Sequence, residues 1–154
     1  MTEIELDAFD RALLNVVQQN NLTPARLIAK QVGLSESAVL RRLRRLRKIG
    51  VIISDISVVR PASLGRTLTV IVLVSLVREG LRQIEKFSEV IRARSEVVNT
   101  WYVTGEADFV VVLQLKDMSH YELFTHEVFL SDPNVANFKT MVSMRDIVLT
   151  ALPK

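Results

Sequence analysis

Apolar residues recur at helical spacing in the first third of the chain and predict three helices there. Thr23 is the predicted N-cap of the second helix, whose first residue is a proline, and Ser35 is the predicted N-cap of the third. Gly33 lies between these two helices, where a positive φ ends a helix without strain. The three predicted helices cover residues 7–19, 24–32 and 35–49.

The third predicted helix is apolar on one face and cationic elsewhere. Val39, Leu43 and Leu46 fall at i, i+4 and i+7 and form a stripe that we expect to be buried. A compact basic block on the remaining surface is typical of nucleic-acid binders, although a solvated helix face explains the charge alone equally well. The block contains Arg41, Arg42, Arg44, Arg45, Arg47 and Lys48.

Two helices joined by a short turn that contains glycine form the helix-turn-helix arrangement, whose second helix enters the DNA major groove. Helix N-termini and their hydroxyls suit phosphates, whereas side chains near the start of the second helix reach base edges. Arg42 is a predicted DNA contact, but it lies beside the apolar stripe, so pairing with an acid of the first helix is equally open. The other predicted contacts are Thr23, Ser35, Arg44 and Arg45 with the DNA backbone, and Ser37 and Arg41 with base edges.

A change of pattern follows the helices. Residues 51–59 alternate loosely between apolar and polar and predict a short strand or wing. Pro61 and Gly65 then mark a linker. We therefore divide the chain into a helix-turn-helix domain over residues 1–60 and a second domain over residues 61–154.

The second domain reads as strand and helix patterns in the order βαββαβ, which is the ferredoxin-like layout of one sheet with two helices. The chain is thus predicted to be an α+β protein, with an N-terminal three-helix, winged helix-turn-helix domain and a C-terminal ferredoxin-like domain. The predicted strands cover residues 67–77, 97–104, 109–115 and 135–144, and the predicted helices begin after Gly80 and at Met118.

The first strand of this sheet is apolar on both faces. Ile71 and Leu73 lie on the face opposite to Val70 and Val72, and the third strand repeats the pattern. Because two helices cover only one face, the second apolar face predicts a homodimer formed by packing two sheets together. A two-fold dimer also presents paired recognition helices to a pseudo-palindromic DNA site.

Composition narrows the classes of function. The 154-residue chain has no cysteine and two histidines, which argues against disulfide scaffolds, metal sites and a resident cofactor. The basic excess is N-terminal, since residues 1–60 carry a net charge of +4 and residues 61–154 one of −1. Neither a secretory pattern nor an apolar run near the ~20 residues of a membrane span is found, so no membrane association and a cytoplasmic location are expected.

Several motifs occur together, in chain order, over nearly the whole length. They are Leu6-Asp7-x-x-Asp10-Arg11-x-Leu13-Leu14, Val32-Gly33-Leu34-Ser35 and Val103-Thr104-Gly105-Glu106-Ala107-Asp108-Phe109. With these motifs the chain resembles the Lrp/AsnC family, the leucine-responsive or feast/famine transcription regulators. The resemblance implies an N-terminal domain that binds double-stranded promoter DNA, a C-terminal domain that binds a small effector, usually an amino acid, and homodimers that assemble into tetramers or octamers.

The resemblance also implies an effector site between dimers, around the hairpin at residues 104–108. Asp108 or Glu106 can accept the ammonium group of an amino acid, and N–H groups at the Gly105 turn can bind its carboxylate. The loop before the last helix and the final strand are expected to adjoin this hairpin. Each of these residues alone is equally well explained as a turn, cap or core residue. The predicted effector residues are Thr104, Gly105, Glu106, Asp108, Asp117, Met118, Thr140 and Met141.

Three other functions compete with this hypothesis. An RNA-recognition motif stacks bases on aromatic residues of its third strand, but residues 110–115 are aliphatic with one Gln. A relative of the sirohaem decarboxylases needs basic and His side chains over a tetrapyrrole, whereas His120 and His126 lie on a predicted helix flank and no catalytic residues are recognisable. An architectural DNA-binding protein of the same family that ignores small ligands stays open.

Overall fold

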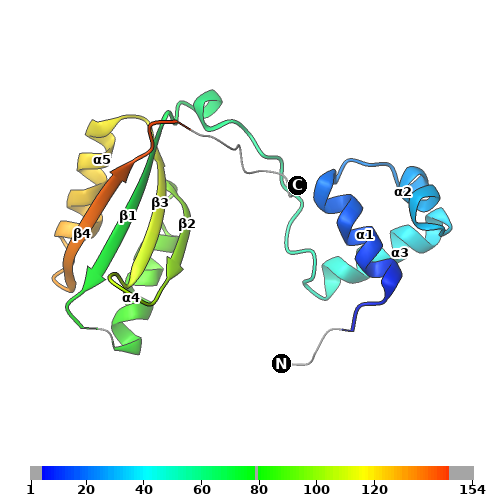
Figure 1. The fold of residues 1–154 in the computed structure, drawn as a ribbon, viewed down its shortest axis with the longest axis horizontal. Helices are drawn as coiled ribbons and strands as arrows, with labels where there is room; N and C mark the ends of the chain where they lie inside the picture. The colour runs from blue at the N-terminus through cyan, green and yellow to red at the C-terminus, as the bar shows by residue number, and fades with distance from the viewer. Residues whose placement is uncertain (1–4, 79, 146–154) are drawn as a thin grey trace. The chain divides into compact units, whose positions relative to one another are not determined.

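The computed structural model describes residues 5–78 and 80–145, which form two compact units. The first unit holds the described residues up to Val58, and the second begins at Val59 (Figure 1). Each unit has a hydrophobic core of its own. Since a separate core is the mark of a domain, the chain contains two domains.

Three helices form the first unit, as the apolar spacing predicts. The helices are α1 (Ala8–Gln19), α2 (Ala25–Val32) and α3 (Glu36–Lys48). Short amphipathic helices gain most of their stability by covering one another's apolar faces. All three contribute to the core, and the predicted apolar stripe of α3 is confirmed as buried. The buried core residues are Leu13, Ile28, Ala29, Val39, Leu43 and Leu46.

Side-chain caps define the start of α1 and of α3. The Asp7 carboxylate accepts a hydrogen bond from the Asp10 N–H at 2.8 Å, and the Ser35 hydroxyl accepts one from the Ala38 N–H at 3.3 Å. Gly33 ends α2 with a φ of 71°, which residues with a side chain rarely adopt. The predicted cap at Ser35 and the predicted turn at Gly33 are therefore confirmed.

The prediction that Thr23 caps α2 is wrong. Its hydroxyl donates to the carbonyl of Asn20 at 2.8 Å and so closes the turn after α1. The N-cap of α2 is Pro24, which makes no side-chain cap. A threonine hydroxyl has several backbone partners within reach, and here the turn on its N-terminal side is the partner that it bonds.

The segment after α3 is extended but is not a strand. The predicted strand over residues 51–59 is wrong, because no described segment pairs with these residues to form a ladder. Their alternation leaves Ile53, Ile56 and Val58 exposed. A short 3₁₀ helix, η1 (Pro61–Leu64), then lies near the start of the second unit.

Among the described residues of the second unit, four antiparallel strands and two helices follow η1 in the predicted βαββαβ order, which is thereby confirmed. The strand order across the sheet is β2-β3-β1-β4, so the first and third strands are central. The last predicted helix is present, although its second half, η2, is π-helical. The elements are β1 (Leu68–Leu76), α4 (Leu81–Arg92), β2 (Val97–Tyr102), β3 (Phe109–Leu115), α5 (Met118–Phe124), η2 (Thr125–Leu130) and β4 (Val135–Val142).

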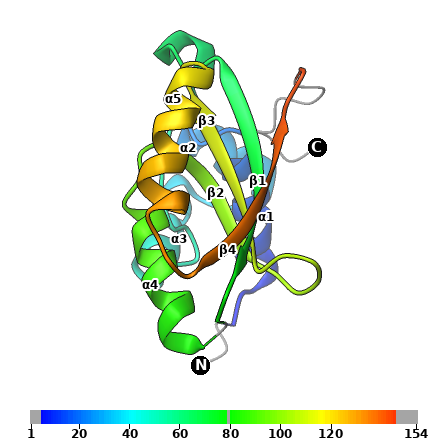
Figure 2. The same cartoon turned by 90° about the vertical axis from the view of Figure 1, so that its left-hand side faces the viewer.

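The helices α4 and α5 cover the same face of the sheet (Figure 2). Alternate residues of β1 and β3 point into the core beneath these helices and are buried. On the opposite face, which we call the open face, Ile71, Leu73, Val110 and Val112 are only half-buried. The predicted apolar character of both faces is therefore confirmed. The largest buried side chains of this core include Phe87, Ile91, Leu113, Leu115 and Phe129.

Candidate DNA interface and effector site

Four polar side chains form a stripe along the surface of α3. Ser37, Arg41, Arg44 and Lys48 are exposed and lie three or four residues apart, on the side of the helix opposite the buried stripe. In the described part of the chain, none of the three basic residues lies within 4 Å of an acid. We call these four residues the exposed stripe. Its cations are available to phosphates or base edges.

Two acids at the start of α1 hold the neighbouring arginines of α3. Arg42 Nη1 lies 2.7 Å from Asp7 Oδ2 and 2.8 Å from Asp10 Oδ1, and Arg45 Nη1 lies 2.8 Å from Asp10 Oδ2. The side chain of Asp10 is only 1% exposed, whereas those of Arg42 and Arg45 are 25% and 47% exposed. We call these four residues the Asp10 cluster. Of the two possibilities open for Arg42, the structure contains the pairing with acids of the first helix.

Burial and hydrogen bonding act on Asp10 in opposite directions. Burial favours the neutral acid and by itself raises the pKa of Asp10, but hydrogen bonds from Arg42 and Arg45 outweigh it and hold this pKa below its ordinary value. The pKa of Asp7 is also lowered, above all by the hydrogen bond from the Asp10 N–H. Both carboxylates are therefore ionised at neutral pH.

A second ion pair joins the end of α3 to the extended segment. Arg47 Nε and Nη2 donate to the two carboxylate oxygens of Asp55, at 2.7 and 3.1 Å. These hydrogen bonds lower the pKa of Asp55 and raise that of Arg47. With Arg42 and Arg45 also paired, half of the predicted basic block is neutralised within the chain, and the exposed stripe holds the rest.

Two hydroxyls that are predicted to contact phosphates have partners within the chain. Ser35 Oγ caps α3 and lies 3.2 Å from Ser37 Oγ, while the Thr23 hydroxyl bonds the turn after α1. A phosphate would have to share or replace these bonds. Contact of Ser35 and Thr23 with DNA stays a prediction.

The hairpin between β2 and β3 is an exposed turn that is anchored at its base. Gly105 adopts a φ of 130°, and Thr104 and Glu106 are exposed. Asp108 Oδ2 accepts a hydrogen bond from the Leu76 N–H at 2.6 Å, where the register between β1 and β4 shifts. Asp108 therefore has a structural task at this point, whether or not it also meets a ligand.

The predicted effector residues do not gather in one place within one chain. The hairpin precedes β3, while Asp117 and Met118 follow its other end, about 20 Å away along this strand. Asp117 caps α5 by accepting a hydrogen bond from the His120 N–H at 2.9 Å. Within one chain, β3 separates the loop before the last helix from the hairpin, whereas the final strand adjoins it, because Lys139 Nζ lies 3.6 Å from Glu106 Oε2. Whether the loop adjoins the hairpin of a second copy stays a prediction.

Thr140 and Met141 lie on opposite faces of the sheet. Thr140 is paired with Val72, and its hydroxyl forms a hydrogen bond with the Tyr121 hydroxyl on the helix-covered face. Met141 is paired with Ile71 on the open face, since successive residues of a strand alternate. One surface of one chain therefore does not present both side chains.

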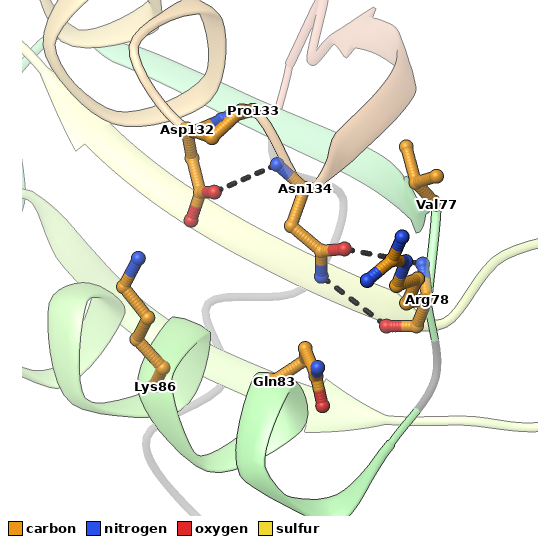
Figure 3. A pocket seen from close by; sticks show the side chains of 7 residues that line it. All are labelled: Val77, Arg78, Gln83, Lys86, Asp132, Pro133 and Asn134. Carbon is orange, nitrogen blue, oxygen red and sulfur yellow. Dashed lines mark hydrogen bonds between the residues drawn. The ribbon is translucent and has the colours of Figure 1, made fainter.

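A pocket of about 350 Å³ lies where β1 ends (Figure 3). Asn134 forms a fixed wall, because its side-chain oxygen accepts a hydrogen bond from the Arg78 N–H and its amide donates to the Arg78 carbonyl. As far as the described residues go, none of the predicted effector residues lines this pocket. Its other lining residues are Val77, Gln83, Lys86, Asp132 and Pro133.

The histidines have ordinary surface surroundings. His120 Nε2 lies 3.4 Å from Glu96 Oε1, and His126 is exposed. Over residues 5–78 and 80–145, no group of three or more His, Asp and Glu side chains is placed to hold a metal ion. A search of the same residues finds no helix long and apolar enough to cross a membrane.

Comparison with known protein families covers most of the chain. Residues 6–47 match the AsnC-type helix-turn-helix domain, and residues 69–152 match the Lrp/AsnC ligand binding domain. The first match includes nearly all of the three-helix unit, and the second starts in β1. The fold and these matches define a helix-turn-helix transcriptional regulator that carries a ligand-binding domain.

Individual relatives support the same conclusion. An uncharacterized HTH-type transcriptional regulator of Sinorhizobium fredii, y4tD, is 46% identical over 96% of this chain and 87% of that protein. The leucine-responsive regulatory protein of Haemophilus influenzae is 33% identical over 94% of this chain and 87% of its own length. A transcriptional regulator of Neisseria meningitidis, solved in complex with L-Met, has a TM-score of 0.85 at 28% identity and covers 97% of both chains. The protein belongs to the Lrp/AsnC family of transcriptional regulators, as its motifs predict.

Proposed function

We propose that the protein binds a specific promoter sequence through the exposed stripe of α3. The observation that carries this proposal is the position of Arg41 and Arg44, which are exposed, lack an acidic partner in the described chain and lie opposite the buried face of a recognition helix. Ser37 and Arg41, near the start of α3, face base edges, whereas Arg44 meets the DNA backbone. Thr23 and Ser35 add backbone contacts near helix N-termini.

Arg41→Ala tests this assignment. We expect the affinity for promoter DNA to fall by about tenfold or more, because one arginine that reads a base is worth roughly 1–3 kcal/mol. Arg92→Ala is the matched control, since Arg92 is an exposed arginine on α4 of the other unit, and it should leave the affinity unchanged. An Arg41→Ala protein that keeps its oligomeric state and binds promoter DNA as tightly as the wild type would refute the assignment.

The second part of the proposal is that the C-terminal unit binds an amino acid or a related small metabolite. Its match to a ligand-binding domain supports this, as does the L-Met held by the related regulator of Neisseria meningitidis. The hairpin offers exposed polar groups around Gly105, with Thr104 and Glu106 on either side.

The spread of the predicted effector residues supports a site between protomers. Asp117 and Met118 follow the far end of β3 from the hairpin of the same chain, so an effector that contacts both needs a second copy. This arrangement makes effector binding depend on assembly. It agrees with a homodimer that assembles further, to a tetramer or an octamer.

A panel of the common amino acids, with L-Met among them, tests the effector hypothesis by thermal shift. A ligand that binds only the native state stabilises it by RT ln(1 + [L]/Kd), about 2.7 kcal/mol at a hundredfold excess over Kd. We expect at least one amino acid to raise the melting temperature. No shift across the whole panel would favour the alternative of an architectural DNA-binding protein without an effector.

The proposal assigns no catalytic activity to the protein. A regulator of this kind acts where the chromosome is, so the proposal also places it in the cytoplasm. The position of His120 beside Glu96 favours a surface ion pair over a tetrapyrrole site. Absorbance of a bound tetrapyrrole in the purified protein would contradict this part.

A further inference from the structure

The Asp10 cluster divides the basic residues of α3 into two groups. Arg41, Arg44 and Lys48 belong to the exposed stripe, while Arg42 and Arg45 are bonded to acids of α1. The division is not visible in the sequence, where all five lie within eight positions of one helix. It changes the number of cations that α3 offers to DNA.

We propose that Asp10, assisted by Asp7, is a specificity-determining residue that withholds Arg42 and Arg45 from the DNA backbone. The inference rests on the proposed function, in which α3 meets DNA. It assigns a positioning task to an acid that does not itself touch DNA. By this account the predicted DNA contacts of Arg42 and Arg45 are not made.

In the described part of the chain, Arg42 and Arg45 are the cations that lie within 4 Å of the Asp10 carboxylate. Each carboxylate oxygen of Asp10 accepts a bond from one arginine at 2.8 Å, and almost none of its side chain is exposed to water. If either arginine turned to a phosphate, an ionised oxygen would be left in an apolar environment without its donor. Such an uncompensated buried charge is strongly unfavourable, so the arginines stay with Asp10 when DNA binds.

Further contacts hold both guanidinium groups in place. Arg42 Nη1 also bonds Asp7 at 2.7 Å, and its guanidinium carbon lies 5.6 Å from the centre of the Phe9 ring. Arg45 Nη2 donates to the Glu5 carbonyl at 3.3 Å. Each arginine therefore has at least two partners in the first unit, and leaving them for DNA would break several interactions at once.

Withholding two cations affects specific and non-specific binding differently. Contacts with phosphates raise affinity for every DNA sequence and steepen its salt dependence, whereas contacts with base edges distinguish sequences. With Arg42 and Arg45 occupied, the exposed stripe carries most of the interaction through Ser37 and Arg41, which face bases. Asp7 and Asp10 thus keep the affinity for non-specific DNA low and preserve the discrimination between DNA sequences.

Asp10→Asn is the first test, with binding to promoter DNA and to random duplex measured as a function of salt. A neutral side chain releases one or both arginines. We expect the slope of log Kobs against log[salt] on random duplex to steepen by about 0.9 for each arginine that reaches a phosphate, and the ratio of specific to non-specific affinity to fall. Glu85→Gln makes the same change in net charge on the surface of the other unit, and its slope should match the wild type.

A second pair of variants leaves the buried acid in place. Arg44→Gln removes a cation of the exposed stripe, while Arg45→Gln removes one that is bonded to Asp10, one position further along the helix. We expect Arg44→Gln to reduce the magnitude of the salt slope by about 0.9 and Arg45→Gln to leave it unchanged. Asp10 keeps Arg42 in the Arg45→Gln variant, and a circular-dichroism melting curve measured beside the wild type checks that the first unit stays folded.

The outcomes separate the inference from the proposed function. Two results would overturn the inference while DNA binding by α3 stands. The first is a salt slope that Arg45→Gln reduces as much as Arg44→Gln does. The second is a salt slope and a specificity of Asp10→Asn that equal those of Glu85→Gln. If the wild-type protein binds no duplex at low salt, the proposed function itself fails. A steeper slope with lower specificity for Asp10→Asn alone supports the inference.

Discussion

Asp10 is the residue at which burial and charge compete most directly. It lies on the buried side of α1, three positions before the core residue Leu13, where an apolar side chain is the ordinary choice. An acid there is tolerated because two arginines satisfy both of its oxygens. From the sequence, pairing with an acid of the first helix was one of two possibilities for Arg42, and neither the burial of Asp10 nor its bond with Arg45 was predicted.

The lowered pKa of Asp10 predicts how acid affects stability. The pKa of this carboxyl group is lower in the folded protein than its value of about 3.9 in the unfolded chain. Its ionised form therefore stabilises the fold at every pH above about 3.9, and this contribution is lost as the pH falls through the folded-state pKa. We expect Asp10→Asn to lower the free energy of unfolding by about 1–3 kcal/mol at pH 7, less than for a fully buried pair because both arginines are partly exposed.

Urea unfolding at a series of pH values measures this difference. The gap between wild type and Asp10→Asn should narrow as the pH falls below about 4, because the wild-type carboxylate then takes up its proton. A gap that stays constant over this range would show that the ionised form of Asp10 does not stabilise the fold. The wild-type protein at pH 7 serves as the reference for every measurement.

Asp108 is a second residue with a structural task at a predicted ligand site. Removing its carboxylate with Asp108→Ala leaves the N–H of the buried Leu76 without this acceptor, which costs about 1–3 kcal/mol. We expect this loss in urea unfolding without any effector present. Glu106→Ala, at an exposed position of the same hairpin, should change the free energy of unfolding by less than about 0.5 kcal/mol. Equal effects of the two changes would contradict the anchoring of the hairpin by Asp108.

At the scale of the element, α3 depends on how it begins. The Ser35 hydroxyl bonds the Ala38 N–H and satisfies one of the backbone donors that the first turn leaves free. Ser35→Ala should therefore lower the free energy of unfolding by about 1 kcal/mol. Ser37→Ala is the matched control, because Ser37 is an exposed serine in the same first turn, and in the described chain its hydroxyl meets the Ser35 hydroxyl and bonds no backbone donor. A smaller loss for Ser35→Ala than for Ser37→Ala would show that the cap is unimportant.

The elements also show why one local prediction succeeded and another failed. Ser35 follows Gly33, whose positive φ ends α2, and in the described chain its hydroxyl bonds the Ala38 N–H and meets the Ser37 hydroxyl, both within α3. Thr23 follows Asn20, whose carbonyl at the end of α1 accepts hydrogen bonds from both the N–H and the hydroxyl of Thr23. Both residues have the chemistry of an N-cap, and only the path of the backbone around them decides between the two partners.

At the scale of the whole molecule, the open face of the sheet predicts assembly. Ile71, Leu73, Val110 and Val112 form a patch of half-buried apolar side chains that the two helices of the unit leave uncovered (Figure 2). Contiguous apolar surface of this kind is typical of protein interfaces. A second copy of the same face is self-complementary about a two-fold axis, so we expect a homodimer formed through the sheets.

Leu73→Glu tests this arrangement. An acid on each open face brings two like charges together in a desolvated interface, so we expect the variant to sediment as a monomer where the wild type is a dimer or larger. Leu123→Glu makes the same substitution at an exposed position of α5 on the helix layer and should leave the assembly unchanged. A Leu73→Glu protein that sediments like the wild type would place the interface elsewhere.

The sequence alone determined the elements, their apolar faces and the family. Helix and strand periodicity depend on neighbours within a few positions, so the three helices, the four strands of the sheet and the buried stripe of α3 are readable from local spacing. The strand predicted after α3 failed because a ladder needs a partner that local spacing does not supply.

Only the tertiary structure decided which charges are paired and which predicted effector residues share a surface. Asp10 meets Arg45 across 35 positions of the chain, and this contact depends on how α1 packs against α3. Strand order and register placed Thr140 and Met141 on opposite faces, and they placed Asp117 at the far end of β3 from the hairpin. These relations depend on the packing of distant elements, because residues that are far apart in the sequence come close to one another only once the chain has folded.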